Sequence, residues 1–60
     1  MNDDLYWSEV ANWLIDTYRW SRRKITAKIN KFKKQMVSEL QEIYAIEPFV
    51  VANEIASTQD

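Results

Sequence analysis

Apolar side chains recur at helical spacing along almost the whole of this 60-residue chain. At about 100° per residue, five apolar residues of the first third fall on one stripe: Trp7, Val10, Ala11, Leu14 and Tyr18. A second ridge with a seven-residue spacing, Tyr6, Trp13 and Trp20, lies beside that stripe. The pattern predicts a helix over about residues 4–20 that is capped by Asp3 or Asp4. Its apolar arc is wide enough to contact two surfaces.

A second apolar stripe predicts a longer helix over about residues 22–46. Its members follow one another at intervals of three or four residues: Ile25, Ile29, Phe32, Met36, Leu40 and Ile43. Four lysines occupy the side opposite the stripe: Lys24, Lys28, Lys31 and Lys34. Several of these lysines are neighbours on the helix surface, so the helix needs negative charges from elsewhere to offset their repulsion.

The junction between the two predicted helices carries no strong helix breaker, because residues 17–29 include no Gly, Pro, Asn or Asp. The pattern therefore permits one long continuous helix as well as a helical hairpin. We favour the hairpin, with the chain folding back near residues 21–23. That fold would bring two acids of the first helix close to two lysines of the second: Glu9 and Asp16 to Lys34 and Lys28.

The dipeptide Glu47-Pro48 marks the clearest boundary in the chain. Proline has no amide donor, but it suits the first turn of a new helix. Phe49, Ala52 and Ile55 then repeat at helical spacing, which predicts a short third helix over about residues 48–56 with Phe49 as its anchor. Residues 57–60 form a polar tail, and residues 1–60 together form a single small all-α domain.

A chain of this size lacks the usual means of stabilising a small core. It has no Cys and no His, which excludes disulfides and the common zinc ligands, so self-association remains. Two antiparallel copies of the second helix would pair their charges, with Lys31 opposite Glu39 of the partner subunit and Lys28 opposite Glu42 of the partner subunit. We therefore expect an antiparallel helical-bundle homodimer with the six residues of the second stripe in its core.

All eight basic residues fall within residues 19–34, and no acid interrupts them. This basic block comprises Arg19, Arg22, Arg23, Lys24, Lys28, Lys31, Lys33 and Lys34. The nine acids flank it on both sides, so the formal net charge of −1 hides a strongly segregated distribution. Such a block is either neutralised within the folded assembly or available to an anionic partner.

The composition argues against catalysis. Without His or Cys the chain lacks the commonest general base and the strongest nucleophile, and without Gly it lacks a phosphate-cradling loop. The nearest candidate for a metal site, Glu39 with Glu42, has no histidine to complete it. We expect no enzymatic activity, no metal, no cofactor and no small-molecule substrate.

The aromatic ridge favours a role in protein binding. Trp and Tyr beside Arg are residue types that dominate protein–protein hot spots. The expected partner-binding residues are Tyr6, Trp13, Trp20, Arg22, Arg23 and Lys33. We therefore expect a small regulatory binding protein, of bacterial or phage origin, that docks on a larger protein and modulates or inhibits it.

Two other functions fit the same sequence. The first is a small DNA- or RNA-binding regulator, because a helix with a basic face can follow phosphate groups. The candidate nucleic-acid-binding residues are Lys24, Lys28, Lys31 and Lys34. Arg22, Arg23 and Asn30 would then reach base edges, although no helix-turn-helix spacing or glycine turn frames them. Trp20 would stack on a base. The second alternative is a structural module that assembles only with itself.

The N-terminus and the hydropathy of the chain favour a cytoplasmic location. The chain begins Met1-Asn2-Asp3-Asp4, which is acidic where a signal peptide would be basic. No apolar run approaches the ~20 residues that span a bilayer. We expect a cytoplasmic protein without a membrane partner.

Overall fold

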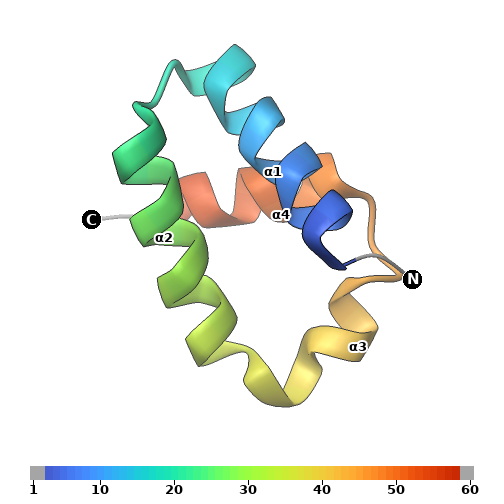
Figure 1. Cartoon of the computed structure of the whole chain (residues 1–60). Coiled ribbons are helices and arrows are strands. Elements are labelled where there is room, and N and C mark those ends of the chain that lie inside the picture. The colour runs from blue at the N-terminus through green and yellow to red at the C-terminus, as the bar shows by residue number, and fades with distance from the viewer. Residues whose placement is uncertain (1–2, 59–60) are drawn as a thin grey trace.

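The computed structural model describes residues 3–58, and every regular element in that range is helical. The elements are α1 (Asp3–Tyr18), α2 (Arg22–Gln35), the 3₁₀ segment η1 (Val37–Glu39), α3 (Leu40–Ile43) and α4 (Pro48–Ser57). The predicted all-α fold is therefore confirmed. Figure 1 shows α4 crossing behind α1 and α2, and α1 packs against both of the other long helices.

The first two helices are separated by a three-residue connection, which excludes the alternative of one continuous helix. Arg19 adopts the left-handed conformation with φ of 60°, and its N–H still donates to the Ile15 carbonyl at 3.0 Å. Ser21 then caps α2, because its Oγ accepts from the Lys24 N–H at 3.2 Å. Helix α1 therefore ends two residues before the predicted boundary at residue 20.

The second helix is much shorter than predicted. It ends at Gln35 instead of continuing to residue 46, with Met36 as its C-cap, and the chain goes on through η1 and α3. A straight helix over residues 22–46 would be roughly 37 Å long at about 1.5 Å per residue. The longest dimension of the Cα trace is only 27 Å. The bend keeps α3 against the core, where Ile43 is buried, and this tertiary packing overrides the helical periodicity.

The third predicted helix corresponds to α4, which begins at Pro48 as expected and ends at Ser57. Its predicted anchor is wrong. Phe49 is 43% exposed, whereas Val51, Ala52 and Ile55 are buried. The helix therefore turns a different face to the core from the face that its aromatic residue suggests.

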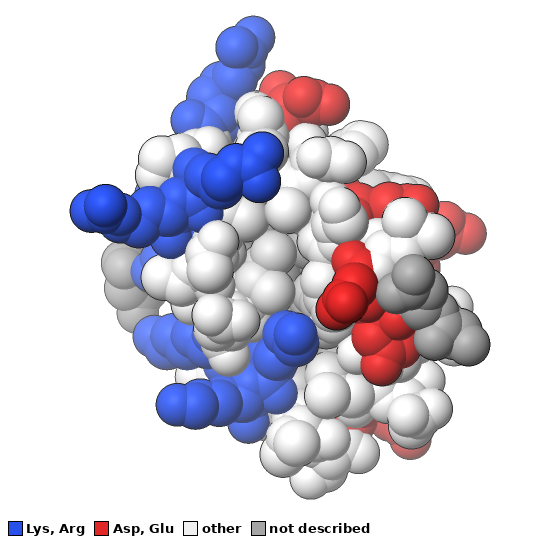
Figure 2. Space-filling model, viewed as in Figure 1, with Lys and Arg blue, Asp and Glu red and all other residues white. Residues whose placement is uncertain are grey.

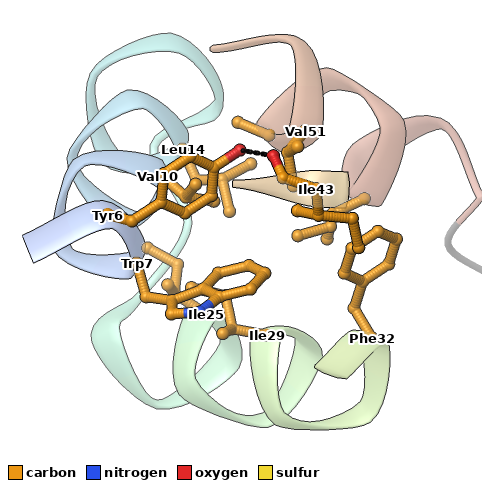
Figure 3. Close-up of a cluster of buried hydrophobic side chains, with 11 residues drawn as sticks. Tyr6, Trp7, Val10, Leu14, Ile25, Ile29, Phe32, Ile43 and Val51 are labelled. Carbon is orange, nitrogen blue, oxygen red and sulfur yellow. Dashed lines mark hydrogen bonds between the residues drawn. The ribbon is translucent and has the colours of Figure 1, made fainter. Parts of the chain in front are cut away.

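The core is built from residues of all four α-helices, and Figure 3 shows them converging. Val10 and Leu14 of α1 and Ile55 of α4 are completely buried. The other buried side chains are Tyr6, Trp7, Ile25, Ile29, Phe32, Ile43, Val51 and Ala52. Met36 and Leu40 are half-buried and pack against this cluster. All six residues of the second stripe therefore contribute to the core of a single chain.

The predicted dimer register does not fit this chain. It requires one straight helix that carries Ile25 and Ile43 on an exposed stripe, but the helix is broken at Met36 and both side chains are buried inside the chain. Pairing Lys31 with Glu39 of the partner subunit required the same straight helix. Self-association through another surface stays a prediction.

Tyr6 links the beginning of α1 to the segment between α3 and α4. Its hydroxyl lies 3.0 Å from the Ile43 carbonyl oxygen and 2.8 Å from the Ile46 carbonyl oxygen, so its single hydrogen is shared between two acceptors. Next to it, the Trp7 Nε1–H donates to the Tyr44 hydroxyl at 3.0 Å. The Tyr6 ring makes edge-on contacts with the rings of Trp7 and Tyr44, at centroid distances of 5.3 and 5.1 Å.

We expect Tyr6→Phe to lower the free energy of unfolding by about 1–2 kcal/mol, because it keeps the ring and removes the hydroxyl. The Ile43 carbonyl would keep the Ile46 N–H at 2.9 Å, whereas the Ile46 carbonyl would lose the Tyr6 donor. Urea denaturation followed by circular dichroism measures the change. The matched control is Tyr18→Phe at an exposed hydroxyl, which should cost less than about 0.5 kcal/mol. Equal stabilities of wild type and Tyr6→Phe would contradict the role of this hydroxyl.

The same pair of proteins tests the ionisation of Tyr6. Burial raises the pKa of Tyr6 above its ordinary value of about 10, and negative charge on Tyr44 and Glu47 raises this pKa further. The folded state therefore favours the neutral phenol. The resulting contribution to stability is complete below pH of about 10 and is lost as pH rises through the raised pKa of the folded state. The stability advantage of wild type over Tyr6→Phe should accordingly shrink in strongly alkaline solution.

Candidate functional site

Helix α2 exposes the largest concentration of like charge on the molecule. Because Ile25, Ile29 and Phe32 face the core, the remaining positions of α2 point away from it. Seven of the eight basic residues lie on this helix, and the eighth, Arg19, lies in the preceding connection. Figure 2 shows Lys and Arg gathered along the α2 side of the molecule, while most visible acidic side chains lie towards the other side.

The exposed part of α2 consists of three rows that follow from its helical period. The outer row lies opposite the buried stripe, and all four of its residues are exposed: Arg23, Ala27, Asn30 and Lys34. One flank carries Lys24, Lys28 and Lys31, of which Lys28 is half-buried. The other flank carries Arg22, Thr26 and Lys33, of which Lys33 is half-buried. Cations therefore occupy both sides of the helix as well as its outermost line.

The basic block is not neutralised within the part of the chain that the structure describes. No carboxylate among residues 3–58 forms an ion pair with any of its eight members. The α1 acids Glu9 and Asp16, which were expected to approach Lys34 and Lys28, form no ion pair with them. Two cations lie against aromatic rings instead: the Lys24 Nζ is 4.3 Å from the Trp20 ring centroid, and the Lys33 Nζ is 5.4 Å from that of Trp7.

The first turn of α2 adds to the unbalanced positive charge. Arg22, Arg23 and Lys24 lie at the N-terminus of the helix, where the peptide dipoles already place positive partial charge. Each cation there costs a few tenths of a kcal/mol or more. The Ser21 cap offsets part of this cost. A negatively charged ligand near this turn would relieve it.

A second exposed feature joins α1, α4 and the connection between α1 and α2, and we call it the aromatic strip. It consists of Phe49, Trp13, Tyr18 and Trp20. The Phe49 and Trp13 rings are 5.5 Å apart between centroids, and the Tyr18 and Trp20 rings are 5.9 Å apart. Trp13, Tyr18 and Phe49 are each 39–43% exposed, while Trp20 is half-buried.

Asn53 of α4 connects the two halves of the aromatic strip. Its Oδ1 accepts from the Trp13 Nε1–H at 3.3 Å and from the Tyr18 hydroxyl at 2.9 Å. One amide oxygen thereby orients two aromatic side chains of α1. The strip ends at Lys24, whose ammonium lies over the Trp20 ring, so the aromatic surface runs into the basic face of α2.

The residues predicted for partner binding do not form one surface. Tyr6 is buried and hydrogen-bonded, so its assignment to an exposed ridge is wrong. Trp13 and Trp20 belong to the aromatic strip, and Arg22 and Arg23 are exposed nearby in the first turn of α2. Lys33 lies on the flank of α2 that meets Trp7, not Trp20.

Three residues of the aromatic strip and its connection were not predicted as part of an exposed site. Tyr18 was expected to pack in the core and Phe49 to anchor the third helix, but both are exposed. Asn53 carries no periodic signal of its own. Since Trp13 and Asn53 are 40 residues apart in the sequence, only the packing of α4 against α1 brings them together.

We also searched the described residues for metal sites, membrane-spanning helices and grooves. Residues 3–58 contain no group of three or more acidic side chains arranged to hold a metal ion. None of the helices in this range combines the length and apolar character needed to cross a bilayer. A shallow groove of about 350 Å³ lies between the start of α1 and the α3–α4 connection, lined by Leu5, Tyr6, Glu9 and residues 44–48.

Comparison of the chain with protein-family models, with curated proteins and with solved structures gave no match in any of the three. The function is therefore inferred from the geometry and charge of the chain itself.

Proposed function

We propose that this protein is a small, non-enzymatic, cytoplasmic regulator that binds the phosphate backbone of nucleic acid through the exposed face of α2. One observation carries the proposal: the cations on three rows of α2 have no carboxylate partner within residues 3–58. Helix α2 has 14 residues and is therefore about 21 Å long. Double-stranded DNA presents about one negative charge per 1.7 Å of its axis, so several phosphates lie within reach of such a helix.

The net charge of −1 does not oppose this proposal, because the charges are segregated. Figure 2 supports a basic face over α2 with most of the visible acids turned to another side. The Cα trace measures 27 × 21 × 17 Å, and electrostatic interactions fall off over about 10 Å at 0.1 M ionic strength. Acids on the far side are therefore largely screened from a ligand bound at α2.

Fluorescence anisotropy of a labelled random-sequence duplex of about 20 base pairs tests the proposal. At about 50 mM salt we expect dissociation constants in the micromolar range, because backbone contacts alone give this order of affinity at moderate salt. A labelled single strand of the same length should also bind. No change in anisotropy with either ligand at about 100 μM protein would overturn the proposal.

The aromatic strip favours a second candidate function, which is docking on a larger protein that the chain modulates or inhibits. Three of its aromatic side chains are about 40% exposed and contact one another or Asn53, and the basic first turn of α2 borders one end. Aromatic residues with Arg at the rim are typical of binding hot spots. The complementary partner surface would combine an apolar pocket with acidic side chains.

We expect Trp13→Ala to abolish capture of such a partner from nuclease-treated host lysate, because it removes the centre of the strip. The variant should keep the helical circular dichroism of wild type, since Trp13 is 39% exposed. Val37→Ala is the matched control, because Val37 is 67% exposed and lies outside the strip. Partner capture that is unchanged by Trp13→Ala would exclude the strip as the docking surface.

The predicted homodimer also remains a proposal. The aromatic strip offers apolar surface to a second copy of the chain, and sedimentation velocity measures the association directly. A dimer that is lost on Trp13→Ala would assign the strip to self-association rather than to a different protein.

A further inference from the structure

We infer that α2 enters the major groove of double-stranded DNA, where Arg23 and Asn30 contact base edges. This inference rests on the proposed function and makes it more specific, since backbone binding alone requires no groove and no base contact. It depends on the layout of the three exposed rows of α2 and on the way in which the helix is held.

The width and outer row of α2 match the shape of the major groove. An α-helix with its side chains is about 10–12 Å in diameter, and the major groove of B-DNA is about 12 Å wide and 8.5 Å deep. The outer row presents four exposed positions, Arg23, Ala27, Asn30 and Lys34, to whatever lies in front of the helix. Ala27 in the middle of this row leaves room for close approach of the helix to the base edges.

The flanks of α2 match the walls of the groove. A helix in the groove has a phosphate backbone on each side, and α2 carries cations on both flanks, Lys24 and Lys31 on one and Arg22 and Lys33 on the other. A helix resting on a flat anionic surface would use its outermost row alone. Cations on both flanks are therefore better explained by a ligand with two phosphate walls.

The packing of α2 on the other helices leaves its exposed side free to enter a groove. Its buried stripe packs on α1 and α4, which leaves the opposite side of the helix unobstructed by either of them. The connection from α1 has only three residues, 19–21, with Arg19 in the left-handed conformation, so α1 fixes the position of the first turn of α2.

The side chains of the outer row have the chemistry of base recognition. Arg donates two hydrogen bonds to guanine, Asn pairs with the N6 and N7 atoms of adenine, and a methyl side chain contacts thymine. Arg23 and Asn30 are seven residues apart, or roughly 10.5 Å along the helix axis at about 1.5 Å per residue. At about 3.4 Å per base pair this separation corresponds to roughly three base pairs. Arg23, Ala27 and Asn30 would therefore read one short site.

Anisotropy titrations with three labelled ligands of equal length, duplex DNA, duplex RNA and single-stranded DNA, test the insertion. The major groove of duplex RNA is too deep and narrow for side chains to read. We expect duplex DNA to bind at least about tenfold more tightly than duplex RNA. Equal binding of the two duplexes would overturn groove insertion while leaving backbone binding intact. Absence of binding to all three would overturn both proposals.

Base contact is tested with a duplex selected by wild-type protein from a randomised library. We expect Asn30→Ala to weaken binding to the selected duplex by about tenfold and binding to a random duplex by no more than about twofold. Asn12→Ala on α1 removes the same side chain outside α2, so it is the matched control and should change neither affinity by more than about twofold. Both positions are exposed, so both variants should fold. Failure to select any sequence, or equal losses of Asn30→Ala on both duplexes, would overturn base recognition.

Discussion

Replacing Leu14 by alanine is expected to remove most of the stability of this protein. Leu14 is completely buried on α1, the helix that packs against both α2 and α4. Truncation of a buried leucine to alanine costs about 2–5 kcal/mol. A 60-residue domain has a total stability of roughly 3–9 kcal/mol at about 0.05–0.15 kcal/mol per residue. The variant should therefore be largely unfolded or melt far below wild type in a circular dichroism experiment.

The control for this variant is Val37→Ala. Val37 lies in η1 and is 67% exposed. Its truncation should change the free energy of unfolding by no more than about 0.5 kcal/mol. If the Leu14 and Val37 variants melted at the same temperature, the packing of α1 in the core would be wrong.

Changing Lys24, Lys31 and Lys34 together to glutamine is expected to weaken nucleic-acid binding on the order of 100-fold at about 50 mM salt. All three side chains are exposed and none has an acidic partner among residues 3–58, so their loss removes ligand contacts without breaking an ion pair. Lys24 also gives up its contact with the Trp20 ring. The helical circular dichroism of the variant should match that of wild type.

A second triple variant keeps the same net charge as the first while leaving α2 intact. Ser8, Asn12 and Gln41 are exposed positions outside α2, and changing them to glutamate lowers the net charge by the same three units. We expect this control to bind nucleic acid within about threefold of wild type at 0.1 M ionic strength, because it leaves every cation of α2 in place and exposed charges are partly screened by salt. If both triple variants lost affinity equally, net charge would explain binding and the α2 face would not.

The helices themselves were predictable because their signals are local. The stripe that includes Ile25, Ile29 and Phe32 identified the core face of α2, and Pro48 marked the start of α4. Periodicity is a reliable guide wherever a helix buries one regular face.

The errors occurred where tertiary contacts override local preference. The break at Met36 involves no glycine or proline, and the left-handed residue of the first turn is Arg19, which has no special tendency towards that conformation. Tyr6 was assigned to an exposed ridge because its acceptors, the Ile43 and Ile46 carbonyls, are 37 and 40 residues away in the sequence. The local sequence pattern does not predict a long-range contact of this kind.

The sequence predicted the basic part of the candidate site but not the aromatic part. The basic block could be read directly, but the sequence did not reveal whether acids of the same chain neutralise it. In the structure the α2 cations form no ion pair with the α1 acids Glu9 and Asp16, and this shifts the preferred interpretation from internal pairing to an anionic ligand. The aromatic strip depends on Phe49 and Asn53 of α4, which reach Trp13 and Tyr18 only through folding.

The salt dependence of binding to duplex DNA tests the central claim most directly. Neutralisation of each phosphate lowers the slope of log Kobs against log salt concentration by about 0.9. For wild type we predict a slope of about −4.5 to −6.3, as expected when five to seven of the eight cations contact phosphates. The slope of the lysine triple variant should be shallower by about 2.7. A wild-type slope near zero, or the same slope for both proteins, would contradict phosphate binding by α2.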